Sequence, residues 1–78
     1  IKIDTEGEDF KILEGSRKIF SKYKPKVIIE VRNENKQDIQ NFFDDINYNL
    51  FAIKEKIFAI DLNKIDIQNI INVYAEPK

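Results

Sequence analysis

The amino-acid sequence predicts an α/β protein with an at least partly parallel sheet, in the order β-α-β-α followed by two to three strands. Two short β-branched runs, at 1–4 and 27–31, are separated by a stretch in which apolar residues recur at helical spacing. A second stretch of helical spacing follows the later run. Strands that alternate with helices in this way form parallel sheets with right-handed crossovers.

The first run, 1–4, ends in an acid, and the Thr5-Glu6-Gly7-Glu8 segment that follows matches a capping box. A strand, a tight turn and a helix are therefore predicted. Gly15 interrupts the apolar stripe of this helix, and Pro25 ends it because proline lacks an amide hydrogen and disfavours helical angles at Lys24. The stripe consists of Ile12, Leu13, Ser16, Ile19, Phe20 and Tyr23.

The second run, 27–31, is almost continuously apolar, which is expected of a strand buried on both faces of a parallel sheet. A polar loop follows, in which Asn33 or Asn35 is placed to cap the next helix. Residues 37–46 are predicted to form that helix, which is amphipathic. Its apolar positions, at i, i+3, i+4 and i+7, are Ile39, Phe42, Phe43 and Ile46.

The remainder of the chain contains further strand-like runs. Residues 48–53 and 57–60 are separated by a polar break short enough for a hairpin. Residues 62–69 form either a loop or one helical turn. The last apolar run is 70–75, and Pro77 closes it.

The composition excludes several classes of function. With 78 residues, 42% hydrophobic and 35% charged, the chain supports one small globular domain at most. The formal net charge of -1, with both signs interspersed, disfavours nucleic acid as a partner. The absence of His and Cys excludes disulfides, Cys/His zinc sites and His-activated nucleophiles. No apolar run approaches the roughly 20 residues that span a bilayer, so no membrane partner is expected and a cytoplasmic location is the default.

Three acidic side chains are predicted to meet at one edge of the sheet. Asp4 and Glu30 lie near the carboxyl ends of the first two strands, where open α/β sheets bind ligands, and Glu6 lies in the turn above. They can serve as a general base, as cation ligands or as hydroxyl acceptors. Turn chemistry and the helix dipole also explain Asp4 and Glu6 as structural residues. Glu30 is the stronger candidate, because an acid inside a buried strand costs free energy unless it is functional or paired, for example with Arg32.

The two glycines of the sequence, Gly7 and Gly15, form no phosphate-binding loop. Gly7 is expected to provide backbone freedom at the turn between strand and helix. No cofactor-binding residue and no metal ligand is assigned on this basis.

Four segments, in this order, resemble the carboxyl-terminal half of FkbM-type methyltransferases. They are Ile1-Lys2-Ile3-Asp4-Thr5-Glu6-Gly7, Ile12-Leu13-Glu14-Gly15, Lys24-Pro25-Lys26-Val27-Ile28-Ile29-Glu30-Val31 and Asn72-Val73-Tyr74-Ala75-Glu76-Pro77. The resemblance covers essentially the whole chain, and the lysine-x-aspartate-x-glutamate-glycine segment is its most specific part. It implies a partial Rossmann-like methyltransferase fold. Residues 1–4 would be the fourth strand of a seven-stranded sheet, 26–31 the fifth, and the later runs the sixth and seventh.

The resemblance also implies a function for residues 1–78 as the carboxyl-terminal half of the domain. The amino-terminal half, with the glycine-rich loop that binds S-adenosylmethionine, would precede Ile1. This chain would form the acceptor-side wall, with Asp4, Glu6 and Glu30 at the rim and a sugar or small-metabolite hydroxyl as the methyl acceptor. The parent would be an O-methyltransferase, and the isolated chain would be inactive.

Two other hypotheses stay open. The chain can be a small α/β interaction module in which all three acids are structural. Alternatively, Asp4, Glu6 and Glu30 can bind Mg²⁺ in a nuclease-like domain, although the usual strand lysine and a basic surface are missing. Independently of these, an apolar edge strand at residues 1–4 predicts self-association, because unpaired strand edges pair with other chains.

Overall fold

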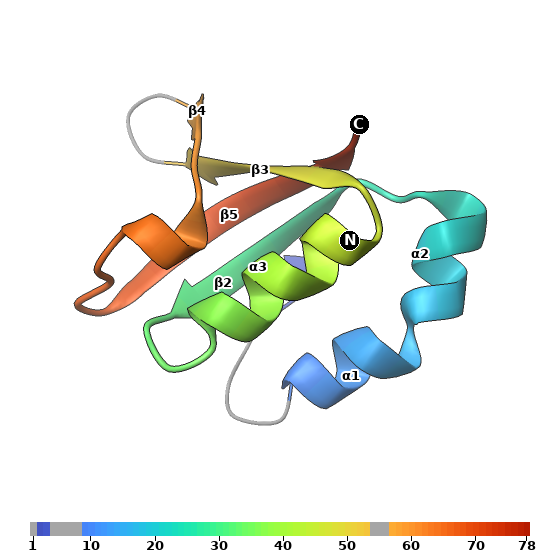
Figure 1. Ribbon diagram of the computed structural model, residues 1–78, viewed down its shortest axis with the longest axis horizontal. Helices are drawn as coiled ribbons and strands as arrows, with labels where there is room; N and C mark the ends of the chain where they lie inside the picture. The colour runs from blue at the N-terminus through green and yellow to red at the C-terminus, as the bar shows by residue number, and fades with distance from the viewer. Residues whose placement is uncertain (1, 4–8, 54–56) are drawn as a thin grey trace.

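The structure, a computed structural model, describes residues 2–3, 9–53 and 57–78. They form one sheet with helices packed on one of its faces (Figure 1). The elements in chain order are β1 (Lys2–Ile3), α1 (Asp9–Gly15), α2 (Arg17–Tyr23), β2 (Val27–Arg32), α3 (Lys36–Asp45), β3 (Tyr48–Ile53), β4 (Ile57–Ala59), the 3-10 helix η1 (Leu62–Lys64) and β5 (Ile70–Pro77). The predicted α/β class is confirmed.

The sheet has five strands in the order β1-β2-β5-β3-β4. From β2 to β4 each strand runs antiparallel to its neighbours, while the two residues of β1 pair in parallel with β2. The antiparallel pairing of β5 with β2 and with β3 was not predicted. It arises because β5 lies between β2 and β3 and runs antiparallel to both. β1 lies at one edge of this sheet, and self-association through that edge stays a prediction.

β2 is buried on one face only, so the prediction of a strand buried on both faces was wrong. Val27, Ile29 and Val31 face the core, whereas the intervening Ile28 is 38% exposed. The reason is that the described helices all pack on the same side of the sheet, so every second side chain of the strand faces away from them.

Aromatic side chains fill the core between the sheet and the helices. Phe42 and Phe43 of α3 are fully buried, with ring centroids 5.2 Å apart at 87°. Phe20 of α2 meets Phe42 at 5.6 Å and 81°. These edge-to-face contacts are a geometry that aromatic rings prefer. The prediction that Phe42 and Phe43 belong to the core is confirmed.

The first predicted helix is divided into α1 and α2, which meet at a steep angle around Ser16 (Figure 1). Phe20 enters the core as predicted, but Ile19 is 53% and Tyr23 68% exposed. Their assignment to the apolar stripe was therefore wrong. A stripe that is continuous in the sequence does not stay on one side of the molecule when the helix axis changes direction.

The hairpin predicted at 48–60 is confirmed as the antiparallel pair β3–β4. The segment after it forms one 3-10 turn, which settles the choice between loop and helical turn. Leu62 in this turn is fully buried, and its backbone N–H donates to Gln40 Oε1 of α3 at 2.7 Å. Gln40 in turn donates from Nε2 to Asp44 at 3.0 Å. The buried glutamine thus fixes η1 on α3.

Tyr48 joins the start of β3 to the loop before β2. Its hydroxyl donates a 2.7 Å hydrogen bond to the carbonyl of Pro25, and its side chain is 2% exposed. Burial raises the pKa of Tyr48 above its ordinary value. Because a phenolate cannot donate this bond, the stability it contributes is present below the unfolded pKa near 10 and is lost as the pH rises through the raised folded pKa.

Replacing Tyr48 by phenylalanine is expected to lower the free energy of unfolding at pH 7 by about 1 kcal/mol, the contribution of a typical hydrogen bond. It is also expected to reduce the loss of stability above about pH 10. Urea unfolding at a series of pH values from 7 to about 11 measures both effects. Tyr23→Phe, at a position that is 68% exposed, is the control and should change neither. An unaltered alkaline pH dependence in Tyr48→Phe would contradict the assignment.

Candidate functional site

The predicted site lies at the carboxyl ends of β1 and β2. The two strands pair in parallel through residues 2–3 of β1. Asp4 and Glu6 lie outside the described residues, so their proximity to Glu30 stays a prediction. Of the three predicted site residues, the structure positions Glu30.

Glu30 lies on the face of the sheet that the described helices leave open. Its side chain is half-buried, it alternates with the buried Ile29 and Val31, and its cross-strand neighbour in β5 is Asn72. Glu30 therefore does not enter the core, and the desolvation cost assumed for a strand buried on both faces is reduced. Glu30 and Arg32, two residues further on the same face, each interact with other residues. A half-buried carboxylate in this position can be reached by a small molecule.

The loop after β2 is tied to the segment before β5. Asn33 Oδ1 accepts a hydrogen bond from the backbone N–H of Ile67 at 3.2 Å. Lys36 donates from Nζ to the carbonyl of Ile65. Asn35 occupies the N-cap position of α3 without a side-chain cap bond, and its Oδ1 accepts instead from the backbone N–H of Arg32, at the end of β2, at 2.9 Å. The sequence did not predict this contact between the loop and the segment before β5. It predicted only that one of the two asparagines, Asn33 or Asn35, caps the next helix.

An apolar row crosses three strands of the open face beside Glu30. Ile28 of β2 lies opposite Tyr74 of β5, which lies opposite Phe51 of β3. The rings of Phe51 and Tyr74 are 6.0 Å apart at 35°. The Tyr74 hydroxyl donates to Glu76 at 3.1 Å, and burial, then this carboxylate, raise the pKa of Tyr74. The sequence did not predict the row, because it joins strands that are distant along the chain.

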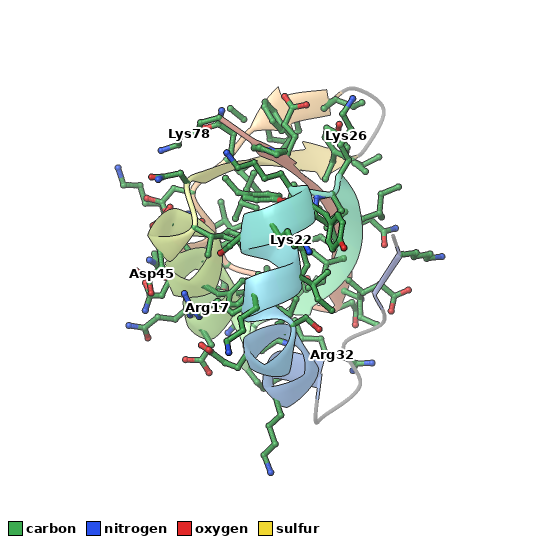
Figure 2. The ribbon with its side chains drawn as sticks, turned by 90° about the vertical axis from the view of Figure 1, so that its right-hand side faces the viewer. Arg17, Lys22, Lys26, Arg32, Asp45 and Lys78 are labelled. Atoms are coloured by element: carbon green, nitrogen blue, oxygen red, sulfur yellow. The ribbon has the colours of Figure 1, made fainter. Side chains whose placement is uncertain are left out.

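The two ends of β2 differ in their surroundings. Figure 2 shows Lys26 and Arg32 near opposite ends of this strand. The Arg32 end carries Glu30 and the tethered loop. At the Lys26 end, a hollow of about 300 Å³ on the open face is lined in part by Ile28 and Tyr74. The open face of β2 therefore offers an apolar surface with a carboxylate toward its carboxyl end.

Residues 1–57, from β1 to the start of β4, match the family model of the methyltransferase FkbM domain. The chain belongs to the FkbM methyltransferase family. No curated protein and no solved structure matches it. The resemblance to FkbM-type enzymes is thus confirmed over residues 1–57, and the fourth segment, 72–77, lies outside the match. Glu30 lies inside the matched part of this FkbM chain. None of its described helices has the length and apolarity needed to cross a membrane.

Proposed function

We propose that this chain forms the acceptor-side part of an S-adenosylmethionine-dependent methyltransferase domain, and that the domain methylates a hydroxyl oxygen of a sugar or another small metabolite. The family match over residues 1–57 carries the proposal. The strand directions, the position of Glu30 and the apolar row beside it support the acceptor-side assignment.

The strand directions support a Rossmann-like parent domain. β1 is parallel to β2, and β2 and β3 run the same way because both are antiparallel to β5. Helices α1 and α2 lie between β1 and β2 in the chain, and α3 lies between β2 and β3. Sheets built from such units bind ligands outside the carboxyl ends of their strands. Glu30 and the tethered loop after β2 lie toward that edge.

Gly15 is the one glycine that the structure describes, and its surroundings do not favour the close approach of a cofactor. At Gly15 an added side chain would meet nothing within 4 Å, so no group approaches this glycine closely. Gly7 lies outside the described residues. We therefore assign cofactor binding to an amino-terminal half of the parent domain, as the resemblance implies, and derive no step of the reaction through the cofactor. The role proposed for this chain concerns the acceptor.

Glu30 is the proposed base for the acceptor hydroxyl. An oxygen becomes a better nucleophile as its proton moves to a positioned carboxylate, and such general-base catalysis contributes about 10²–10⁴-fold to a rate. The row of Ile28, Tyr74 and Phe51 supports a ring-shaped, uncharged acceptor, because small-molecule sites combine apolar walls with a few polar groups. Asp4 and Glu6 are proposed to belong to the same rim.

Titration of the parent protein with S-adenosylmethionine in a calorimeter tests the proposed function, and saturable binding is expected. Transfer of a labelled methyl group to a panel of sugars then tests the base. Glu30→Gln is expected to lower kcat/KM by about 100-fold while leaving the cofactor Kd unchanged. Glu34→Gln, an exposed position in the loop with the same change of charge, should leave both unchanged. If the parent protein does not bind S-adenosylmethionine, the proposed methyltransferase function is contradicted. If Glu30→Gln leaves kcat/KM unchanged, only the proposed role of Glu30 as the general base is contradicted.

A further inference from the structure

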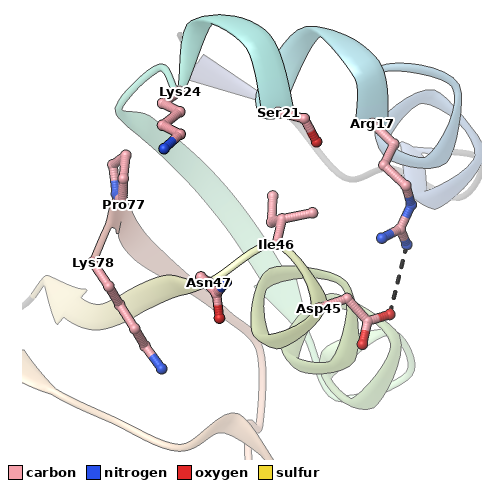
Figure 3. A pocket seen from close by; sticks show the side chains of 8 residues that line it. All are labelled: Arg17, Ser21, Lys24, Asp45, Ile46, Asn47, Pro77 and Lys78. Atoms are coloured by element: carbon pink, nitrogen blue, oxygen red, sulfur yellow. Dashed lines mark ion pairs between the residues drawn. The ribbon is translucent and has the colours of Figure 1, made fainter.

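A hollow of about 580 Å³ lies between α2, the carboxyl end of α3 and the start of β3, at the edge of the sheet away from the proposed acceptor site (Figure 3). We propose that it binds the phosphate or diphosphate group of a small molecule. Three cationic side chains and one acidic side chain line it. The lining residues are Arg17, Ser21, Lys24, Asp45, Ile46, Asn47, Pro77 and Lys78.

The acidic side chain of the hollow is already engaged. Arg17 holds Glu14 through Nε at 3.2 Å and Nη2 at 3.0 Å, and its Nη2 lies 3.8 Å from Asp45 Oδ2. The guanidinium also lies 4.8 Å from the ring centroid of Phe42. Arg17 thus spans from α2 to α3, and its one positive charge faces two carboxylates, Glu14 and Asp45. Together with Lys24 and Lys78, the cationic side chains exceed these two carboxylates by one positive charge.

Lys24 and Lys78 are available to an anion. Within residues 9–53 and 57–78, neither ammonium group takes part in an ion pair. Figure 3 shows that Lys24 and Ser21 project from the α2 segment to the side on which Ile46 and Asn47 lie. An ammonium, a hydroxyl and an amide N–H are donors that oxyanions accept, and bonds from charged donors are the strongest of these.

The backbone of Lys24 caps α2 in a left-handed conformation that is unfavourable for a residue with a side chain. Lys24 follows α2 with φ 48° and ψ 53°, and its N–H donates to the Phe20 carbonyl at 2.9 Å. Glycine usually occupies this left-handed position because a Cβ is unfavourable there, and the following Pro25 restricts Lys24 further. Strain of this kind concentrates at functional sites.

The second residue with a positive φ lies at the same hollow. Among the described residues, the two non-glycine residues with positive φ are Lys24 and Asn47, at 61°, and both line it. The carboxyl ends of α2 and α3 carry partial negative charge, which stabilises the Lys24 cation and moderates the affinity for anions. We therefore expect a Kd on the order of 1 mM for free diphosphate. A volume of about 580 Å³ leaves room for the remainder of a small molecule.

The proposal is tested by titrating the protein with sodium diphosphate at constant ionic strength and monitoring the backbone amide chemical shifts by NMR. Saturable shifts are expected at Ser21, Lys24 and Asn47. Lys24→Gln is expected to weaken binding about fivefold or more, the effect of losing one charged hydrogen bond. Lys18→Gln removes the same charge from an exposed position of α2 that does not line the hollow, and should change the Kd less than twofold. No saturable shift, or equal weakening in both variants, would overturn the proposal.

A glycine at position 24 separates ligand binding from helix capping. Lys24→Gly is expected to raise the Tm by a few degrees, because glycine adopts positive φ without strain. It is also expected to weaken diphosphate binding as much as Lys24→Gln does. A more stable protein with weaker binding shows that the loss is not caused by unfolding. If Lys24→Gly binds diphosphate with unchanged affinity, the Lys24 side chain does not contribute to binding, and the proposal is overturned. The test needs no methyl transfer, so it is independent of the proposed enzymatic function.

Discussion

Replacing Phe43 by alanine is expected to lower the free energy of unfolding by about 3–5 kcal/mol, the range found for large-to-small changes of a buried phenylalanine. Phe43 has no exposed surface. Its ring centroid lies 6.1 Å from that of Phe20, 5.2 Å from that of Phe42 and 5.4 Å from that of Tyr48. Truncation therefore removes ring contacts with α2, α3 and β3 together, and leaves a cavity where these elements meet.

Urea unfolding followed by circular dichroism measures this loss. Phe58→Ala is the matched control, because it makes the same change at a side chain of the edge strand β4 that is 46% exposed. Its expected cost is below about 1 kcal/mol, as for most substitutions of exposed residues. Similar losses in the two variants would contradict the assignment of Phe43 to the centre of the core.

Replacing Val73 by aspartate is expected to lower the free energy of unfolding by about 4 kcal/mol or more. Val73 is fully buried in β5, between Ile29 of β2 and Ala52 of β3. Burial of a carboxyl group raises its pKa by up to about 3–5 units. At a pH where this group is ionised in the unfolded chain, each unit lowers the free energy of unfolding by about 1.4 kcal/mol. At pH 7 the variant is expected to be largely unfolded, as seen by circular dichroism.

The same change on the open face provides the control. Ile70→Asp also replaces a β-branched residue of β5, but Ile70 is 42% exposed and lies opposite Arg32. Its expected cost is below about 1 kcal/mol. The pair of variants tests whether the sheet is covered on one face in solution. A loss in Ile70→Asp as large as that in Val73→Asp would contradict the one-sided arrangement.

Elements with a complete amphipathic pattern could be predicted from the sequence. The helix predicted at 37–46 is α3 at Lys36–Asp45, because Ile39, Phe42 and Phe43 all face the sheet. The hairpin β3–β4 was also predicted, because a short polar break between two apolar runs leaves few other connections. In these cases the signal is local, and the structure depends on neighbours along the chain.

Features that depend on distant partners could not be predicted. Periodicity shows which residues share a face, and it does not show whether another layer covers that face, so Ile28 was wrongly assigned to the interior. The position of β5 between β2 and β3 has no local signal either. For the candidate site, the chemistry of Glu30 was visible in the sequence. Its surroundings were not, because Tyr74 and the contact between Asn33 and Ile67 join segments far apart along the chain.

The central place of β5 has a consequence during synthesis on the ribosome. β2 and β3 are made first, yet each uses β5 as its antiparallel hydrogen-bonding partner, and β5 begins only at Ile70. Until β5 emerges, β2 and β3 each have one edge whose backbone N–H and C=O groups are unpaired. Chaperones or neighbouring polypeptides can bind such edges. Closure of the sheet therefore requires β5, which joins β1 and β2 on one side to β3 and β4 on the other.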